Sequence, residues 1–87
     1  MKVQFRESFV KDLRDILDKK LLGRVRAAIE ALEQAQDLGD VAGLKKLEGE
    51  KLRYRIRVGD YRLGLSIEGD VVTLVRFLHR RDIYRYF

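Results

Sequence analysis

The stretch that decides the fold is Arg53-Tyr54-Arg55-Ile56-Arg57-Val58-Gly59-Asp60-Tyr61-Arg62-Leu63-Gly64-Leu65-Ser66-Ile67. Polar and apolar residues alternate on both sides of Gly59-Asp60, which is the pattern of two half-buried β-strands joined by a two-residue turn. With that turn, Arg57 lies opposite Arg62. Further from the turn, Arg55 lies opposite Gly64, which leaves an open floor beside the guanidinium groups. The sequence therefore predicts a β-hairpin with an apolar face and an arginine-rich face.

A further strand is expected after the hairpin. Residues 71–78 are apolar on both sides for most of their length, which suits a central strand, and Glu68-Gly69-Asp70 supplies the turn before them. Near the start of the chain, residues 2–6 alternate as a short half-buried strand does. The sheet is therefore expected to hold four strands, three of them in an antiparallel meander.

Two amphipathic helices are expected between the first strand and the hairpin. Apolar residues recur at helical spacing over residues 9–18 and again over residues 22–36. Ser8 can cap the first helix, and Lys19-Lys20 marks the break between the two. We expect the helices to form an antiparallel hairpin that covers one face of the sheet.

This order of elements defines the fold class. Residues 37–43 are expected to form a loop that leads through residues 44–49 into the β-hairpin. A strand, a helical hairpin, a three-stranded meander and a short C-terminal segment make an α+β arrangement. The 87 residues suffice for a single domain, 1–87. A domain this small has a narrow stability margin.

Composition excludes several classes of protein. Hydrophobic residues make up 46 % and charged residues 38 %, as in a folded protein with a well-solvated surface. The absence of cysteine and the single histidine exclude a disulfide framework, a thiolate nucleophile and a zinc site of soft ligands. Without a membrane-spanning run or a secretory signal, a cytoplasmic protein is expected. No cofactor is expected, so catalysis would fall to Arg, Lys, Tyr, carboxylates and His79.

Positive charge and aromatic rings gather towards the C-terminal end. The net charge of +5 points to a polyanionic or acidic partner. After the central strand the chain continues as His79-Arg80-Arg81-Asp82-Ile83-Tyr84-Arg85-Tyr86-Phe87. Guanidinium groups bind phosphates and ring faces stack on unpaired bases, so this combination is typical of an RNA site.

Each of these features also has a purely structural interpretation. The hairpin arginines can be the solvated face of a half-buried hairpin, paired with Glu48, Glu50 or Asp60. The C-terminal tyrosines can be partly buried packing residues, and a lone histidine such as His79 is more often structural than catalytic. The clustering of so many cationic and aromatic side chains favours a site.

Three segments resemble the successive signatures of a known family. They are Leu44-Lys45-Lys46-Leu47-Glu48-Gly49, then Tyr54-Arg55-Ile56-Arg57-Val58-Gly59-Asp60-Tyr61-Arg62-Leu63, then Leu78-His79-Arg80-Arg81-Asp82-Ile83-Tyr84. In order, spacing and position they are similar to the small bacterial toxins of the RelE/ParE superfamily, and the resemblance covers the whole chain. It implies a RelE-like α+β fold.

The resemblance also implies a catalytic set. In the ribosome-dependent RelE ribonucleases, a basic pair on the second strand, arginines on and after later strands, and a nearby tyrosine form the active site. The matching residues, with a histidine where several relatives carry a functional basic residue, are Arg55, Arg57, Arg62, His79, Arg80 and Tyr84. Further basic residues are expected to bind the RNA: Lys45, Lys46, Lys51, Arg53, Arg81 and Arg85.

The sequence departs from the family pattern where proton transfer is concerned. Arg55 and Arg57 stand where the best-known members have lysines, and arginine stays charged, so these residues can stabilise an anion but cannot act as a base. Histidine titrates near neutral pH, which makes His79 the natural acid or base and Tyr84 the second candidate. Val41-Ala42-Gly43 stands where some relatives use a glutamate base.

The resemblance implies a toxin of a type II toxin–antitoxin system. Such a toxin cuts mRNA on the ribosome without a metal ion, by attack of the RNA's own 2′-hydroxyl on the adjacent phosphate, and so inhibits translation. The implied partners are a cognate antitoxin, normally encoded beside the toxin, the ribosome with its mRNA, and operator DNA only through the antitoxin complex. Two alternatives remain open: a ParE-like inhibitor of DNA gyrase, and a catalytically inactive toxin-fold binding module.

Overall fold

A mixed β-sheet forms the centre of the molecule in the computed structural model, which describes residues 1–49 and 51–87. The pairing suggested for Glu50 lies outside the described residues. The strand order is β1-β5-β4-β3-β2, with β1 parallel to β5 and the other neighbours antiparallel. The strands are β1 (Lys2–Phe5), β2 (Leu44–Lys46), β3 (Arg53–Val58), β4 (Tyr61–Glu68) and β5 (Val71–His79).

The α+β class is confirmed, but the expectation of four strands was wrong. The sheet has five, because Leu44–Lys46 pairs with β3 as the edge strand β2. A strand of three residues is too short for a two-residue alternation to be recognised in the sequence. The long strand β5 lies between β1 and β4, as its apolar character predicted.

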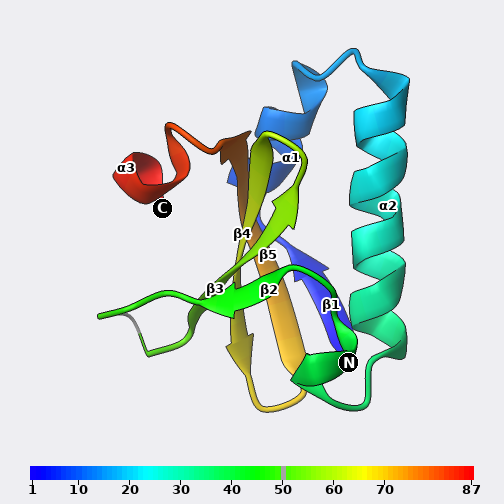
Figure 1. Ribbon diagram of the computed structural model, residues 1–87, viewed down its shortest axis with the longest axis vertical. Coiled ribbons are helices and arrows are strands. Elements are labelled where there is room, and N and C mark those ends of the chain that lie inside the picture. The colour runs from blue at the N-terminus through cyan, green and yellow to red at the C-terminus, as the bar shows by residue number, and fades with distance from the viewer. Residues whose placement is uncertain (50) are drawn as a thin grey trace.

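Helices lie on both sides of the sheet. Figure 1 shows α1 (Glu7–Arg14) and α2 (Lys19–Gln34) on one side, and the short α3 (Ile83–Tyr86) on the other. A 3₁₀ turn (Leu38–Asp40) leads from α2 to β2. Within residues 1–49 and 51–87, no helix has the length and apolar character needed to cross a membrane. The face covered by α1 and α2 is called the helix face below, and the opposite one the outer face.

The hydrophobic core lies between the helix face and the two long helices. Strand side chains that alternate inward meet apolar side chains of the helices and of the loop after α2. The fully buried ones include Phe9, Leu32, Leu63, Leu65, Leu74 and Phe77. Truncating a buried leucine to alanine typically costs about 2–5 kcal/mol, so this layer holds most of the stability of so small a protein.

The helix boundaries differ from the prediction in two ways. Helix α1 ends at Arg14 rather than at residue 18, and Lys19-Lys20 forms the first turn of α2 rather than the break. Asp18 caps α2, accepting hydrogen bonds from the amides of Lys20 (2.9 Å) and Leu21 (3.2 Å). The expected cap at Ser8 was wrong, because the Ser8 hydroxyl instead donates to the carbonyl of Val75 at 2.6 Å.

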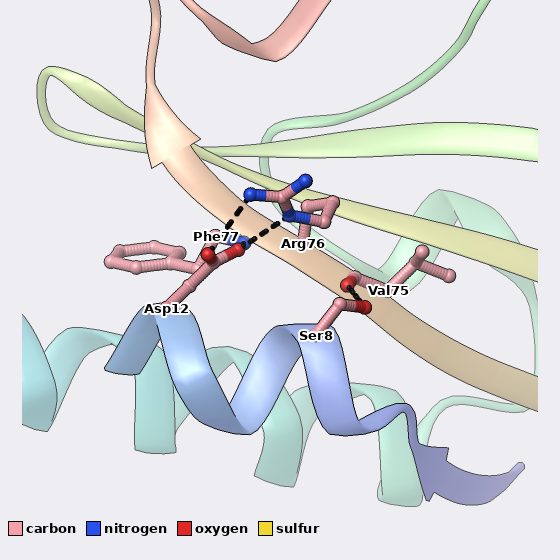
Figure 2. Close-up of polar contacts among 5 residues, drawn as sticks. All are labelled: Ser8, Asp12, Val75, Arg76 and Phe77. Carbon is pink, nitrogen blue, oxygen red and sulfur yellow. Dashed lines mark hydrogen bonds and ion pairs between the residues drawn. The ribbon is translucent and has the colours of Figure 1, made fainter. Parts of the chain in front are cut away.

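Side chains of α1 form hydrogen bonds with the part of the β5 edge that β1 leaves unpaired. Pairing with β1 stops at Leu74, so the later residues of β5 have no strand neighbour on that side. The Asp12 carboxylate accepts from the Phe77 amide (2.8 Å) and from Nε and Nη2 of Arg76 (2.8 and 3.1 Å), as Figure 2 shows. This hydrogen bonding raises the pKa of Arg76 despite partial burial. Helix α1 is therefore fixed to the sheet by polar as well as apolar contacts.

A β-bulge changes which side chains of β5 reach each face. Leu65 of β4 pairs with Leu74, but the next residue, Gly64, pairs with Arg76, so that Val75 is an additional residue in β5. A one-residue shift moves every later side chain to the other face. The bulge therefore brings Phe77 into the core and places His79, two residues later, on the helix face.

Candidate functional site

The outer face of the sheet carries the arginines of the hairpin. The predicted register is confirmed, since Arg57 pairs with Arg62 and Arg55 pairs with Gly64. Lys45 of β2 pairs with Arg55 and extends the row of cations to the sheet edge. These residues alternate with core residues along the same strands, so the same pleat that buries Ile56 and Leu63 directs the cations outward.

The charge on Arg62 is influenced by other predicted catalytic residues. The pKa of Arg62 lies below its usual value, first because of burial and then because of the positive charges of Arg55 and Arg57. Tyr84 raises this pKa and Arg80 lowers it further. Four arginines therefore lie near enough to one another for their charges to interact, and we call them the arginine cluster: Arg55, Arg57, Arg62 and Arg80, with Tyr84 beside them.

Main-chain carbonyls hold two of these guanidinium groups. Nη1 of Arg62 donates to the carbonyls of Gly59 and Tyr61, both at 2.9 Å. Nη1 of Arg55 donates to the carbonyl of Gly43 at 2.6 Å, while its buried Nε has no hydrogen-bond partner among residues 1–49 and 51–87. Neutral carbonyls orient the cations without cancelling their charge, so the cluster keeps its attraction for an anion.

In the part of the chain that the structure describes, two of the ion pairs suggested for the hairpin arginines, with Glu48 and with Asp60, do not form. Within residues 1–49 and 51–87, the ion pairs are Glu7–Lys11, Arg26–Glu30 and Asp12–Arg76, so neither Glu48 nor Asp60 pairs with the cluster. Mutual repulsion of like charges is costly for folding. An arrangement that is unfavourable in the free protein and favourable with a bound anion is typical of a phosphate site.

Tyr84 borders a groove beside the cluster. Its side chain is 67 % exposed, which leaves the ring available for stacking. A groove of about 430 Å³ is lined by residues of β2, of the connection after it and of the C-terminal end: Lys45, Lys46, Leu47, Glu48, Tyr84 and Phe87. A groove lined by both cationic and aromatic side chains suits an unstacked nucleotide.

His79 lies apart from the cluster. On the helix face its ring packs edge-on against Tyr61, with centroids 5.5 Å apart. Its Nδ1 accepts from the backbone amide (3.2 Å) and Nε (3.3 Å) of Arg81. It borders a small hollow with Asp12 and Asp15 of the α1 region. The bulge in β5 thus separates His79 from the other predicted catalytic residues.

The predicted RNA-binding residues occupy several surroundings. Lys45 and Lys46 line the groove, and Lys51 is exposed in the connection between β2 and β3. Arg81 and Arg85 are exposed at the C-terminal end; the Arg85 guanidinium lies 5.6 Å from the ring centroid of Tyr86. Arg53, by contrast, contacts Phe87 rather than solvent alone.

Sequence reasoning missed the role of Phe87. The open floor expected at Gly64 was wrong, because the Phe87 ring lies directly on that glycine. The only sequence signal was the glycine itself within an otherwise regular strand, which marks a close approach by another group.

Within residues 1–49 and 51–87, no three His, Cys, Asp or Glu side chains form a group that could hold a metal ion.

Comparisons with known proteins agree with this architecture. A family model described as the ParE toxin of type II toxin-antitoxin system, parDE, matches residues 3–84. The chain is 41 % identical to Toxin RelE3 of Methanocaldococcus jannaschii, over all of this chain and 99 % of that protein.

Two solved structures of archaeal toxin complexes are similar over nearly the whole chain. One is the RelB-RelE antitoxin-toxin complex from Methanococcus jannaschii (TM-score 0.82, 37 % identity, 97 % of this chain and 98 % of that chain). Another is the RelE-RelB complex from Pyrococcus horikoshii (TM-score 0.74, 26 % identity, 91 % and 93 %). The family model, the curated relative and the shared fold lead to one conclusion. The chain belongs to the RelE/ParE superfamily of toxins of type II toxin–antitoxin systems.

Proposed function

We propose that this toxin is a ribosome-dependent endoribonuclease that cleaves mRNA in the cytoplasm and so inhibits translation. The observation that carries the proposal is the arginine cluster, in which Arg57 pairs with Arg62 across the hairpin, Arg55 follows on the same face, and the charges of Arg80 and Tyr84 also influence Arg62. A cleaved phosphodiester gains negative charge in the transition state, and preorganised cations stabilise that charge. A groove for a nucleotide adjoins the cluster.

The chemistry uses the RNA's own nucleophile. The 2′-hydroxyl gives its proton to solvent water and attacks the adjacent phosphorus, and the bond from phosphorus to the 5′-oxygen of the next nucleotide breaks. That oxygen takes up a proton as it leaves, so the products carry a 2′,3′-cyclic phosphate and a 5′-hydroxyl. Arg57, Arg62 and Arg80 stabilise the phosphate oxygens, and Arg55 holds the backbone. Neither a protein nucleophile nor a metal ion takes part.

The departing 5′-oxygen needs a proton. His79 was expected to supply it, but this side chain lies on the helix face, away from the arginines. We therefore assign proton donation to the hydroxyl of Tyr84, which lies beside the cluster. Tyr84 also offers its exposed ring for stacking on a base.

A cognate antitoxin is the proposed protein partner. The similar archaeal structures are complexes of RelE with RelB, which supports a partner of the same kind for this chain. An acidic or amphipathic segment of the antitoxin would fold along the basic protein as it binds. Operator DNA would be contacted through the antitoxin complex only.

Inhibition of DNA gyrase is the competing function. The matching family model takes its name from the ParE toxins, which supports this alternative. Gyrase inhibition requires a protein-binding surface but no cluster of cations around one point. A catalytically inactive binding module is the third candidate and would retain only the antitoxin contact.

The deciding experiment is inducible expression of the wild type and of an Arg62→Ala/Arg80→Ala variant. We expect growth arrest with the wild type and no arrest with the variant, because removing two of the four clustered cations deprives the transition state of charge stabilisation. Removing one such group typically costs about 10²–10³ in rate. Primer extension on a translated message should map cuts inside the coding sequence, with 5′-hydroxyl ends.

The alternatives predict different results. Growth arrest with intact message would indicate gyrase or another protein target, and its persistence in the double variant would count against the arginine cluster as the active site. Absence of arrest with the wild type would favour the inactive module. Binding of the variant to the antitoxin provides the control for correct folding.

A further inference from the structure

The ring of Phe87 packs on Gly64 and against Arg53 on the outer face of the sheet, and we call this position the Phe87 seat. A Cβ atom built on Gly64 would lie 2.9 Å from two ring carbons of Phe87 and 3.1 Å from a third. Non-bonded carbons normally approach only to about 3.5 Å, so a methyl group at this position would overlap the ring. Gly64 pairs with Arg55 on one side and Arg76 on the other, so the seat lies in the interior of the sheet beside the arginine cluster.

Backbone conformation does not account for this glycine. Among the described residues, the glycines with positive φ are Gly43, Gly49, Gly59 and Gly69, all in turns or loops. Gly64 has a strand conformation that any residue could adopt, and glycine within a strand reduces its stability. Gly64 lies opposite the bulge in β5, and the close approach of the Phe87 ring is a further physical reason for a glycine here.

Arg53, on β3, makes two contacts with Phe87. Its guanidinium carbon lies 4.7 Å from the centroid of the Phe87 ring, which is a cation–π distance. Its Nη1 also donates a hydrogen bond to the main-chain oxygen of Phe87. One arginine thus contacts both the ring and the backbone of Phe87, and its guanidinium is engaged with the protein.

The seat matters because α3 is too short to be stable alone. A helix of four residues cannot offset the cost of nucleation, so contacts with the rest of the protein must hold it. Ile83, which is fully buried, and Phe87 are four residues apart and lie on the same side of the turn. Tyr84 lies between these two anchors, and the connection from Arg80 leads into them.

We propose that Arg53 and Gly64 are positioning residues: they seat Phe87 and thereby hold Tyr84 against the arginine cluster. The proposal rests on the proposed ribonuclease function and deepens it. It gives Arg53 a role different from the direct RNA contact expected from the sequence. Displacing the Phe87 ring with Gly64→Ala should misplace Tyr84 while every side chain that lines the groove is still present.

The test measures single-turnover mRNA cleavage on programmed ribosomes by the wild type, Arg53→Ala, Gly64→Ala, Phe87→Ala and the Gly64→Ala/Phe87→Ala double variant. Small misplacements of reacting groups are costly, so we expect maximal rates to fall by about tenfold or more while half-saturating toxin concentrations stay within about twofold. Gly64→Ala should cause no additional loss in the Phe87→Ala background, because the added methyl group then meets no ring.

Matched controls exist on the helix side of the molecule. Gly23→Ala adds the same methyl group on α2, where nothing lies within 4 Å. Arg26→Ala removes an arginine whose side chain is 83 % exposed. Both should cleave as the wild type does. Full activity of Arg53→Ala and Gly64→Ala would overturn the proposal, as would an Arg53→Ala variant with an unchanged maximal rate and a raised half-saturating concentration, since that result indicates direct RNA contact.

A second readout separates this proposal from the proposed function. With 3-fluorotyrosine incorporated, the ¹⁹F resonance of Tyr84, assigned through Tyr84→Phe, reports its surroundings without any activity. We expect it to move to the position of a freely mobile tyrosine in Arg53→Ala and in Gly64→Ala, while the resonance of Tyr61, stacked on Phe77, stays in place. If the wild type cleaves no RNA, the ribonuclease proposal fails, and an unmoved Tyr84 resonance alone would overturn the positioning role.

Discussion

At the residue scale, the side chain of Asp12 shows how much one residue can contribute to the stability of the fold. It is the only acidic partner of Arg76 among the described ion pairs, and it also accepts the Phe77 amide at the free edge of β5. Both side chains are largely shielded from water, with exposures of 13 % for Asp12 and 27 % for Arg76. Such an interaction is stronger than an exposed surface ion pair.

We expect Asp12→Ala to destabilise the fold by about 2 kcal/mol, because it leaves a charged donor and a backbone amide without an acceptor. Asp12→Asn should cost less, since its oxygen can still accept the Phe77 amide. The pKa of Arg76 is raised in the folded state, so its contribution to stability is present throughout neutral pH and lost only in strong alkali. Urea denaturation at pH 7 measures the free energy of unfolding of the wild type and of both variants.

The exposed pair Glu7–Lys11 is the control for this prediction. Its side chains are 80 % and 63 % exposed, so Glu7→Ala should cost less than about 0.5 kcal/mol. An equal loss for Glu7→Ala and Asp12→Ala would show that burial and edge pairing add nothing to the Asp12 interaction.

At the scale of elements, the first turn of α2 depends on its cap. Asp18 accepts two backbone amides that would otherwise lack a partner. Asp18→Ala should lower the free energy of unfolding by about 1 kcal/mol, and Asp18→Ser should recover most of that loss. Thermal and urea unfolding of the three proteins measure it. Equal stability of the Ala and Ser variants would contradict a capping role.

The elements also show where a sequence determines structure and where it does not. The register of β3 and β4 was predictable, because a two-residue turn between alternating strands leaves one pairing that buries all the apolar residues. The bulge at Val75 was not, because β5 is apolar on both faces and its pattern looks the same with or without a shift. The position of His79 depends entirely on that bulge.

Contacts between distant segments account for the other differences. Ser8 precedes the first apolar residues of the helical pattern, which made it a reasonable cap. In the structure it lies within α1, and its hydroxyl donates to the Val75 carbonyl at the edge of β5. Phe87 reaches Gly64 across the sheet, a contact that no local pattern encodes. The hairpin register predicted that Arg55, Arg57 and Arg62 share one face of the sheet. The family resemblance added Arg80 to this set.

At the scale of the whole molecule, the sheet separates two kinds of chemistry. Helices α1 and α2 cover the helix face, and α3 lies on the other side of the sheet (Figure 1). The hydrophobic core lies under α1 and α2. The hairpin arginines and the groove that Tyr84 borders belong to the outer face. With a net charge of +5, the protein should attract a polyanion chiefly through this second face.

Salt dependence tests that electrostatic asymmetry. Binding to ribosomes programmed with a message blocked by a 2′-deoxy nucleotide should weaken steeply as salt rises, because phosphate contacts release counterions. Lys45→Ala should reduce the slope of log affinity against log salt by about 1, whereas Lys20→Ala, on α2, should leave it unchanged. Equal slopes for the two variants would mean that the outer face is not the preferred contact surface.

The pleat of β3 and β4 has a consequence for how such a protein can change over generations. Neighbouring residues are under different constraints: Ile56 and Leu63 are buried in the core, while Arg55, Arg57 and Arg62, beside them in the chain, lie on the outer face, where we propose that they bind RNA. Substitutions on the outer face can therefore accumulate without unfolding the domain. A lineage can lose, alter or exchange its target while it inherits the same scaffold intact.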